Sequence, residues 1–420
     1  MNEKIKNVKA REILASGGTP SIECQIELEN GVKEKASVPF GASAGIHEAA
    51  VLFDGDKKRY NGQGMLRACK IVNEIIAPKI IGRNIFELEK IDQIMLKLDG
   101  TPNKAKLGGN SLLSVSLAAA RTAAASLKIP LYQFIRQAFK LPYKGYSLPR
   151  PMMVVMEGGK HADDSTDFQE YLFSVNGTKS VREAVRWGEE CYQALKSVLK
   201  TKGLNTNVGN EGAFAPAGIE TNEEPLKLMV QAIQQAGYKP GRDVSLSLDP
   251  ASSEFYDKAE QKYLLKRENA ALSSDQMIAL YNEWLSKYPI ISIEDGLAED
   301  DWAGWTNLFS ELGGRTRIIG DDLTVTNSER VKKAIECKAI NAVLIKLNQI
   351  GTLSETIKTI QLGRRNKFWQ VISHRGGGET NDTFMVDLAV AVNAEYIKVG
   401  PARGERTEKY NRLMAIEEEI

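Results

Sequence analysis

The sequence is poor in the side chains on which proton transfer and structural metal binding most often depend. Its 420 residues include three His and four Cys. The cysteines are widely spaced and form no C-x-x-C pair, so we expect neither a disulfide framework nor a structural zinc site. With so few imidazoles, we expect acid–base chemistry to fall to carboxylates and lysines.

The sequence also lacks an excess of charge and a long apolar run. Lys+Arg number 55 and Asp+Glu 54, so the net charge of +1 gives no general attraction for nucleic acid or for an anionic membrane. No apolar stretch approaches the roughly 18 residues of a membrane span, and the N-terminal residues do not resemble a signal peptide. We therefore expect a cytoplasmic protein with no nucleic-acid or membrane partner.

Two patterns divide the chain. Up to about residue 140, alternating segments separated by turn-forming residues 17–20 and 30–31 predict a small antiparallel sheet, followed by helices. Later, eight short apolar runs alternate with helical segments, as in a (β/α)₈ barrel. We predict an N-terminal α+β domain over residues 1–140 and a barrel over residues 141–420, beginning with a hairpin. The runs are residues 152–156, 171–175, 244–248, 290–293, 317–319, 342–345, 368–372 and 396–399.

The residues that close the barrel strands carry the strongest signal for chemistry. The active site of such a barrel lies at the carboxyl ends of its strands. Three successive strands end in Asp249, Glu294 and Asp321, which predict an oxygen-rich site for a hard divalent cation, preferably Mg²⁺. The alternative is that these acids cap helices or face solvent. Asp295 and Asp322, each second in its pair, are expected to cap or to support the first acid.

The strands that follow end in cations instead. Lys346, His374–Arg375 and Lys398 close them, so the same rim is predicted to bind a metal ion and an anion.

All three histidines lie in loops or at a strand end. His47 and His161 belong to the glycine-bearing segments 41–48 and 158–163, and His374 follows a strand. Glycine-rich loops alone are weak signals. Structural histidines are more often spread over helices and core strands, so the pattern favours a site role for His161 and His374 and leaves His47 undecided.

Together these segments resemble the enolase (phosphopyruvate hydratase) family, from about residue 11 to residue 419. The resemblance implies an enolase-type barrel with an N-terminal α+β capping domain, usually assembled as a homodimer or a larger homo-oligomer. The matching stretches are 41–48 (GASAGIHE), 98–104 (LDGTPNK), 169–170 (QE), 209–212 (GNEG), 248–255 (LDPASSEF), 292–295 (SIED), 321–327 (DDLTVTN), 346–352 (KLNQIGT) and 373–375 (SHR).

The resemblance also implies a chemistry. Sites of the enolase superfamily remove a proton beside a carboxylate with a Lys or His base and one or two Mg²⁺ ions. By resemblance, Lys346 is the base, and Glu211, paired with Glu170, is the general acid, whose pKa we expect burial and the second carboxylate to raise.

The remaining roles are also implied by resemblance. The first Mg²⁺ is assigned to Asp249, Glu294 and Asp321, and a second Mg²⁺, arriving with substrate, to Ser43. His161 is placed in a closing loop near the acid, Lys398 on the substrate carboxylate and Arg375 on the phosphate. Gly376, His374 and Gln169 complete the set expected around a small phosphorylated carboxylate.

Several positions depart from the family pattern. Gly17 stands where the family has an arginine beside the subunit contact, Glu157 where it has an asparagine, and Gly376 where it has a phosphate-binding serine. Lys160 replaces a small residue before His161. Smaller differences are Asn210 in place of an acid, an extra residue near Gly377 and a missing residue near Pro401.

We therefore consider three hypotheses. The first is enolase, which dehydrates 2-phosphoglycerate reversibly to phosphoenolpyruvate. The second, kept open by Gly17 and Gly376, is an enolase-like enzyme for a related phospho- or phosphono-carboxylate, of the carboxyphosphonoenolpyruvate synthase type. The third is a non-catalytic binding protein, which the intact metal ligands, base and acid argue against.

Overall fold

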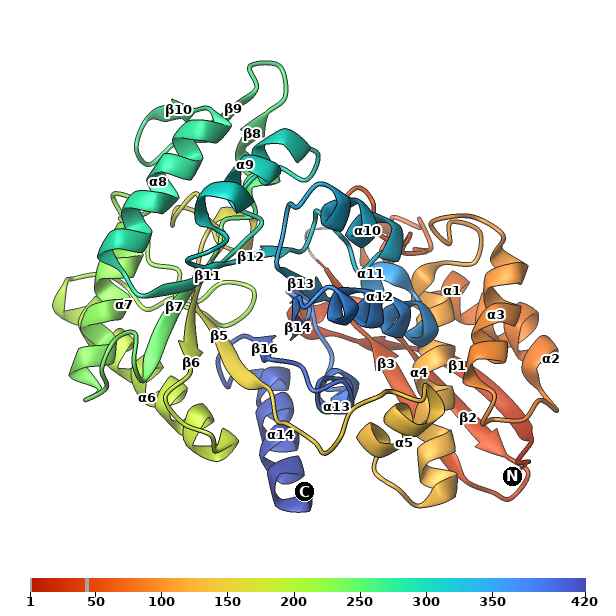
Figure 1. Cartoon of the computed structure of the whole chain (residues 1–420). Coiled ribbons are helices and arrows are strands. Elements are labelled where there is room, and N and C mark those ends of the chain that lie inside the picture. The colour runs from red at the N-terminus through yellow and green to blue at the C-terminus, as the bar shows by residue number, and fades with distance from the viewer. Residues whose placement is uncertain (1, 42–44) are drawn as a thin grey trace.

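The computed structural model describes residues 2–41 and 45–420, which form a cap beside a barrel (Figure 1). The cap begins with an antiparallel sheet of β1 (Ile5–Leu14), β2 (Pro20–Leu28) and β3 (Lys33–Val38). As the sequence predicts, the chain turns at Gly31, whose φ of 88° suits glycine. The cap helices are α1 (Leu66–Ile71), the π-helical η3 (Val72–Ile76), α2 (Ala77–Ile80), α3 (Leu88–Asp99), α4 (Gly109–Leu127) and α5 (Leu131–Ala138).

The core of the cap lies between its sheet and α4. Alternate residues of β2 are buried, from Ile22 to Leu28, because successive side chains of a strand point to opposite faces. The buried face meets α4, which is rich in Ala and Ser and packs against both β2 and β3.

The second part is a closed barrel of eight strands, and all eight predicted runs supply one. β6 is antiparallel to both β5 and β7, so the barrel does begin with a hairpin. The enolase-type fold class is therefore confirmed. The strands are β5 (Arg150–Glu157), β6 (Glu170–Val175), β7 (Val244–Asp249), β11 (Ile290–Glu294), β12 (Arg317–Gly320), β13 (Ala342–Ile345), β14 (Trp369–Ser373) and β16 (Tyr396–Val399).

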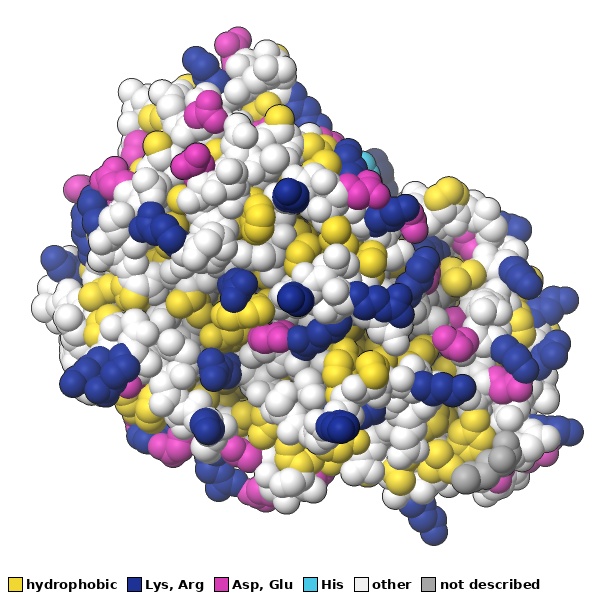
Figure 2. Space-filling view, in the orientation of Figure 1, with side chains coloured by type: hydrophobic (Ala, Val, Ile, Leu, Met, Phe, Trp, Pro, Cys, Tyr) yellow, Lys and Arg dark blue, Asp and Glu magenta, His cyan; other side chains and the backbone are white. Residues whose placement is uncertain are grey.

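Helices surround the barrel, and a small sheet projects from it. The sheet comprises β8 (Tyr256–Asp257), β9 (Lys262–Leu265) and β10 (Ala270–Leu272). The helices are α6 (Val181–Thr201), α7 (Glu224–Gln235), α8 (Ser274–Lys287), α9 (Trp302–Leu312), α10 (Ser328–Glu336), α11 (Leu347–Ile350), α12 (Leu353–Arg365), α13 (Phe384–Ala391) and α14 (Thr407–Glu419). Figure 2 shows a hollow between the β8–β10 sheet and the cap, and it shows basic, acidic and apolar side chains interspersed on this face.

The cysteines are not paired, and the helices are short or polar relative to a membrane span. Cys24, Cys69 and Cys191 are buried free thiols, and burial raises the pKa of Cys69 and Cys191 to about 12. Among the described residues, no single helix is long and apolar enough to cross a membrane; α4 and α5 pass that test only as a pair bent by 105°.

A short strand pair joins the cap to the rim of the barrel. β4 (Phe40–Gly41) pairs with β15 (Gly377–Gly378), two residues after Arg375. The Ser16 hydroxyl donates to the Gly377 carbonyl (2.9 Å) and accepts from the Glu379 N–H (2.9 Å). The segment with the expected extra residue therefore lies between the cap and the carboxyl ends of the strands.

A buried ion pair strengthens the same junction. Arg121 of α4 donates to both carboxylate oxygens of Asp382, at 2.9 and 2.7 Å, and the Ser37 N–H donates to Asp382 at 2.9 Å. The Asp382 side chain is 6% exposed. Burial alone would raise the pKa of Asp382, but Arg121 holds it below its usual range.

We predict that Asp382→Ala lowers the free energy of unfolding by about 2–3 kcal/mol, because Arg121 and the Ser37 N–H lose their shared acceptor. Since the pKa of Asp382 is depressed by folding, this contribution is present at neutral pH and is lost as the pH falls through that pKa. Denaturant unfolding measures both effects. Glu336→Ala removes an exposed pair with Lys332 and is the control, expected to cost less than about 0.5 kcal/mol. Equal losses in the two variants would contradict the prediction.

Candidate functional site

Most of the predicted site residues line one small polar cavity at the carboxyl ends of the barrel strands. Its open volume is about 20 Å³, room for about one water molecule. Glu294 lies beside it, in contact with Lys398, and Ser43 lies outside the described residues. Those that line the cavity are His161, Gln169, Glu170, Glu211, Asp249, Asp321, Lys346, His374, Arg375, Gly376 and Lys398.

Lys398 lies among three buried carboxylates. Its Nζ is 2.7 Å from Glu170, 2.7 Å from Asp249 and 2.6 Å from Glu294, and all four side chains are at most 4% exposed. Burial alone would lower the pKa of Lys398, but these carboxylates raise it well above its usual value. Here Lys398 acts as an internal counter-ion for two of the predicted metal ligands.

Lys346 compensates the third predicted ligand. Its Nζ lies 2.5 Å from Asp321, whose other oxygen accepts from the Gln349 amide (2.7 Å). Burial alone would lower the pKa of Lys346, but Asp321 raises it, so Lys346 is a cation in this arrangement. The partly neutral base expected from the sequence therefore requires that another cation compensate Asp321.

The three predicted ligands fit a divalent cation by their chemistry. Asp249, Glu294 and Asp321 offer only oxygen atoms, as Mg²⁺ prefers. Counting Glu170, four buried carboxylates face two ammonium groups, Lys346 and Lys398. Burial and the charge of Asp249 raise the pKa of Glu294 well above its usual range, as expected where negative charge is under-compensated.

Asp295 has the supporting role expected from the sequence. Its carboxylate accepts from the backbone N–H groups of Asp321 (3.0 Å) and Asp322 (2.7 Å). The loop ends with Val325 and Thr326 at φ of 41° and 54°, which is strained for β-branched residues. The Thr326 hydroxyl accepts from the Lys346 N–H (2.9 Å), so the strained loop is tied to the predicted base.

A second cluster holds the predicted acid. His161 Nδ1 is 3.4 Å from Glu170 and 3.7 Å from Glu211, and His374 Nε2 is 3.0 Å from Glu211. Burial alone would raise the pKa of Glu211, but His374 and His161 hold it well below its usual range. Burial and the charge of Glu211 raise the pKa of Glu170 instead. The expected direction is therefore wrong for Glu211 in this arrangement, and within this pair it is Glu170 whose pKa is raised.

Arg375 is fixed by the cap. It donates to Glu48 (2.8 Å), and both side chains are buried. A Cβ on Gly41 would lie 2.1 Å from the Arg375 Nε, so only glycine leaves room for this guanidinium. His47, by contrast, faces Asp300 at 3.2 Å and is partly exposed.

Two models of one family match most of the chain. The model described as the enolase N-terminal domain matches residues 5–135, and the enolase C-terminal TIM barrel domain matches residues 145–420. The chain belongs to the enolase family. Members of this family are typically hydro-lyases that act on small phosphorylated substrates with Mg²⁺, which agrees with the oxygen-rich ligand set of this site.

One orphaned polar atom in this site points towards a ligand. Gln169 Oε1 is buried and has no hydrogen-bond partner among the described residues. Buried polar atoms are seldom left unsatisfied, so it is a candidate for contact with a bound molecule.

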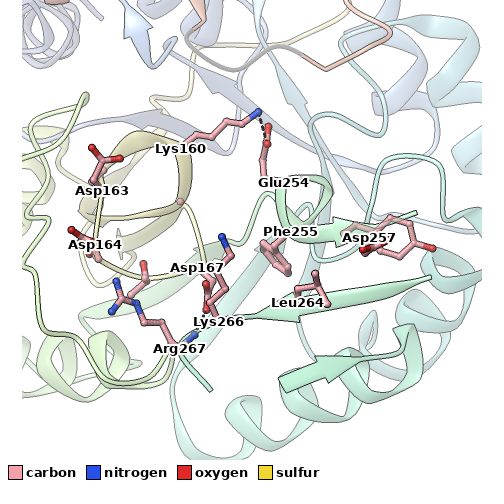
Figure 3. Close-up of a pocket in the computed structure, with 15 residues that line it drawn as sticks. Lys160, Asp163, Asp164, Asp167, Glu254, Phe255, Asp257, Leu264, Lys266 and Arg267 are labelled. Carbon is pink, nitrogen blue, oxygen red and sulfur yellow. Dashed lines mark hydrogen bonds and ion pairs between the residues drawn. The ribbon is translucent and has the colours of Figure 1, made fainter. Parts of the chain in front are cut away.

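The loop that carries His161 also borders a second pocket of this enolase-family barrel. Figure 3 shows Lys160 reaching across to Glu254, and their charged atoms are 2.5 Å apart. Lys160 therefore ties the His161 loop to the segment that follows β7.

Sequence reasoning missed the partners that hold the predicted residues. Glu48 and Gln349 lie in segments that match the family, but no role was predicted for them. Glu157 was predicted only to depart from the family pattern. The patterns name residue types at strand ends, whereas these contacts depend on how separate loops fold onto one another.

We predict that Lys398→Met lowers the free energy of unfolding by about 2–4 kcal/mol in chelator, because three buried carboxylates lose their counter-ion. Added Mg²⁺ is expected to restore more stability to this variant than it adds to the unaltered protein. Thermal and denaturant unfolding with and without Mg²⁺ measure this. The matched control is Lys104→Met, which removes another buried lysine, paired with Glu355 at 2.7 Å, and which Mg²⁺ should not restore. A Lys398→Met variant as stable as the unaltered protein in chelator would contradict the prediction.

Proposed function

We propose that this enolase-family protein is a Mg²⁺-dependent enolase that interconverts 2-phosphoglycerate and phosphoenolpyruvate. The observation that carries the proposal is that the proposed base and acid, Lys346 and Glu211, line one cavity with the buried carboxylates Asp249 and Asp321. A binding protein has no need of this combination.

The chemistry needs a base, an acid and positive charge. Lys346 Nζ takes the proton from the carbon beside the substrate carboxylate, and Glu211 gives a proton to the departing 3-hydroxyl, so that water leaves. Asp249, Glu294 and Asp321 would hold Mg²⁺, whose charge would stabilise the doubly negative carboxylate that develops.

The other residues bind the substrate and handle the proton of the acid. Lys398 provides a cation for the substrate carboxylate and Arg375 one for the phosphate. Glu170, whose pKa is raised, is the neighbour from which Glu211 can regain a proton, and His161 lies between them. Ser43 and a second Mg²⁺ belong to the same proposal, as do a dimeric assembly and a cytoplasmic location.

One observation supports the alternative, an enzyme for a related phospho- or phosphono-carboxylate. Gly376 offers no hydroxyl beside Arg375, and the position of a Cβ there would lie 2.2 Å from Glu211 Oε1. The end of the cavity proposed for phosphate therefore lacks the serine hydroxyl expected from the family resemblance.

We predict that the purified protein with Mg²⁺ and 2-phosphoglycerate forms phosphoenolpyruvate, followed by ultraviolet absorbance. Lys346→Ala should lower kcat by about 10²–10⁴-fold, the usual contribution of a positioned base. Lys332→Ala, an exposed lysine on α10, is the control and should leave kcat unchanged. A rate for the unaltered protein no greater than that of Lys346→Ala would contradict the proposal. If Mg²⁺ then still stabilises the protein, but not Asp321→Ala, the related substrate becomes the better proposal.

A further inference from the structure

Glu157 is a buried carboxylate for which the proposed mechanism has no use. It ends β5 and is 1% exposed. Both of its oxygens lie 3.2 Å from the backbone N of Glu211, and Oε1 also accepts from the Ala213 N–H at 3.1 Å. Its carboxylate therefore holds the backbone of the turn that carries the proposed acid.

Other contacts bind the same turn to β5. The Asn210 N–H donates to the His161 carbonyl (3.2 Å), and the Phe214 N–H donates to the Val155 carbonyl (2.9 Å). A Cβ on Gly209 would lie 2.6 Å from the carboxyl carbon of Glu157, so the backbone of the turn packs directly against the Glu157 carboxyl group. Because these contacts hold its backbone against β5, Glu211 has little freedom to move.

Gly376 lies beside the carboxyl group of Glu211. A Cβ there would be 2.2 Å from Glu211 Oε1 and 3.0 Å from His161 Cε1. The backbone of Gly376 is outside the left-handed region, so conformation does not require glycine there. What requires glycine is the space that the Glu211 carboxyl occupies.

We propose that Glu157 and Gly376 act as a matched pair of positioning residues for Glu211. Glu157 fixes the backbone of the turn, and Gly376 leaves room for the carboxyl, which then meets His374 at 3.0 Å. The inference rests on the proposed function only in naming Glu211 as the acid. It explains why two positions where the sequence is expected to depart from its family both lie against one residue, Glu211.

The charged groups around Glu157 would report a change there. Glu170 is its register partner across the hairpin, His161 Nδ1 is 3.7 Å away, and Arg406 donates to the Asn210 carbonyl of the turn. Burial and Glu211 raise the pKa of Glu157. Loss of a carboxylate from such a cluster lowers the pKa of a neighbouring imidazole.

The chain's three histidines allow a test that needs no turnover. His161 and His374 contact the acid cluster, whereas His47 pairs with Asp300. In protein labelled with ¹⁵N-histidine, we expect Glu157→Ala and Gly376→Ser each to change the signals and titration midpoints of His161 and His374 and to leave those of His47 unchanged.

A double-mutant cycle tests the matching itself. Each single variant should lower kcat by about 10–100-fold with KM changed less than about threefold, because the acid is misplaced while binding groups remain. The double variant should lie within about threefold of the worse single variant, since a turn released from Glu157 can yield to the new serine. Glu157→Gln, which keeps an acceptor oxygen for the turn, should recover part of the loss and replaces Glu157→Ala if that variant does not fold.

The control separates positioning from general stability. Asp92 is also a buried carboxylate that accepts a backbone N–H, from Ser354 at 3.0 Å, and Asp92→Asn should lower stability without moving any imidazole signal. Losses that multiply in the double variant, or His161 and His374 signals that stay unchanged, would overturn the proposal. If the unaltered protein lacks activity on 2-phosphoglycerate, the proposed function fails, and the imidazole signals still decide the role of Glu157 and Gly376.

Discussion

The site depends on one electrostatic constraint, the compensation of negative charge buried at the rim of the barrel. Within the part of the chain that the structure describes, four carboxylates from neighbouring strands contact two lysines, Lys346 and Lys398. Ionised carboxylates removed from water are costly unless cations or hydrogen bonds compensate them. The lysines provide part of that charge, and the remainder is what an oxygen-liganded divalent cation is suited to supply.

The fold makes this concentration of charge possible. The closed barrel brings the carboxyl ends of its strands to one rim, and the antiparallel β6 adds Glu170 opposite Asp249. The cap closes the rim from the other side, where Glu48 binds Arg375 and Gly41 leaves space for it. The backbone N–H groups of Asp321 and Asp322 donate to the Asp295 carboxylate, and these hydrogen bonds keep the loop in its strained conformation. Glu170 contacts both Lys398 in the acid-rich cluster and His161 in the cluster around Glu211, so the two clusters adjoin.

Much of the fold and part of the site could be predicted from the sequence. All eight barrel strands follow from short apolar runs, because a strand buried on both faces must be apolar along its length. Strand-end residues such as Asp249 and Lys398 could be expected to meet, since a barrel brings such ends together. The contacts that each of these residues makes could not be predicted. That Lys398 contacts three carboxylates, or that Glu157 holds the Glu211 turn, depends on loop geometry that no spacing encodes. The direction of the Glu211 pKa was missed for the same reason, because it is set by where His374 lies. Ser43, the domain boundary at residue 140 and the dimer stay predictions.

Counting the protons released when Mg²⁺ binds tests this charge balance most directly. Calorimetric titration of the chelator-treated protein with Mg²⁺, in buffers of different ionisation enthalpy, measures that number. Because carboxylates must be ionised to bind a metal, and burial and Asp249 raise the pKa of Glu294, we predict binding with a net release of protons at neutral pH, abolished in Asp321→Ala. Absence of Mg²⁺ binding, or binding without proton release, would contradict the claim that this cluster is a cation site.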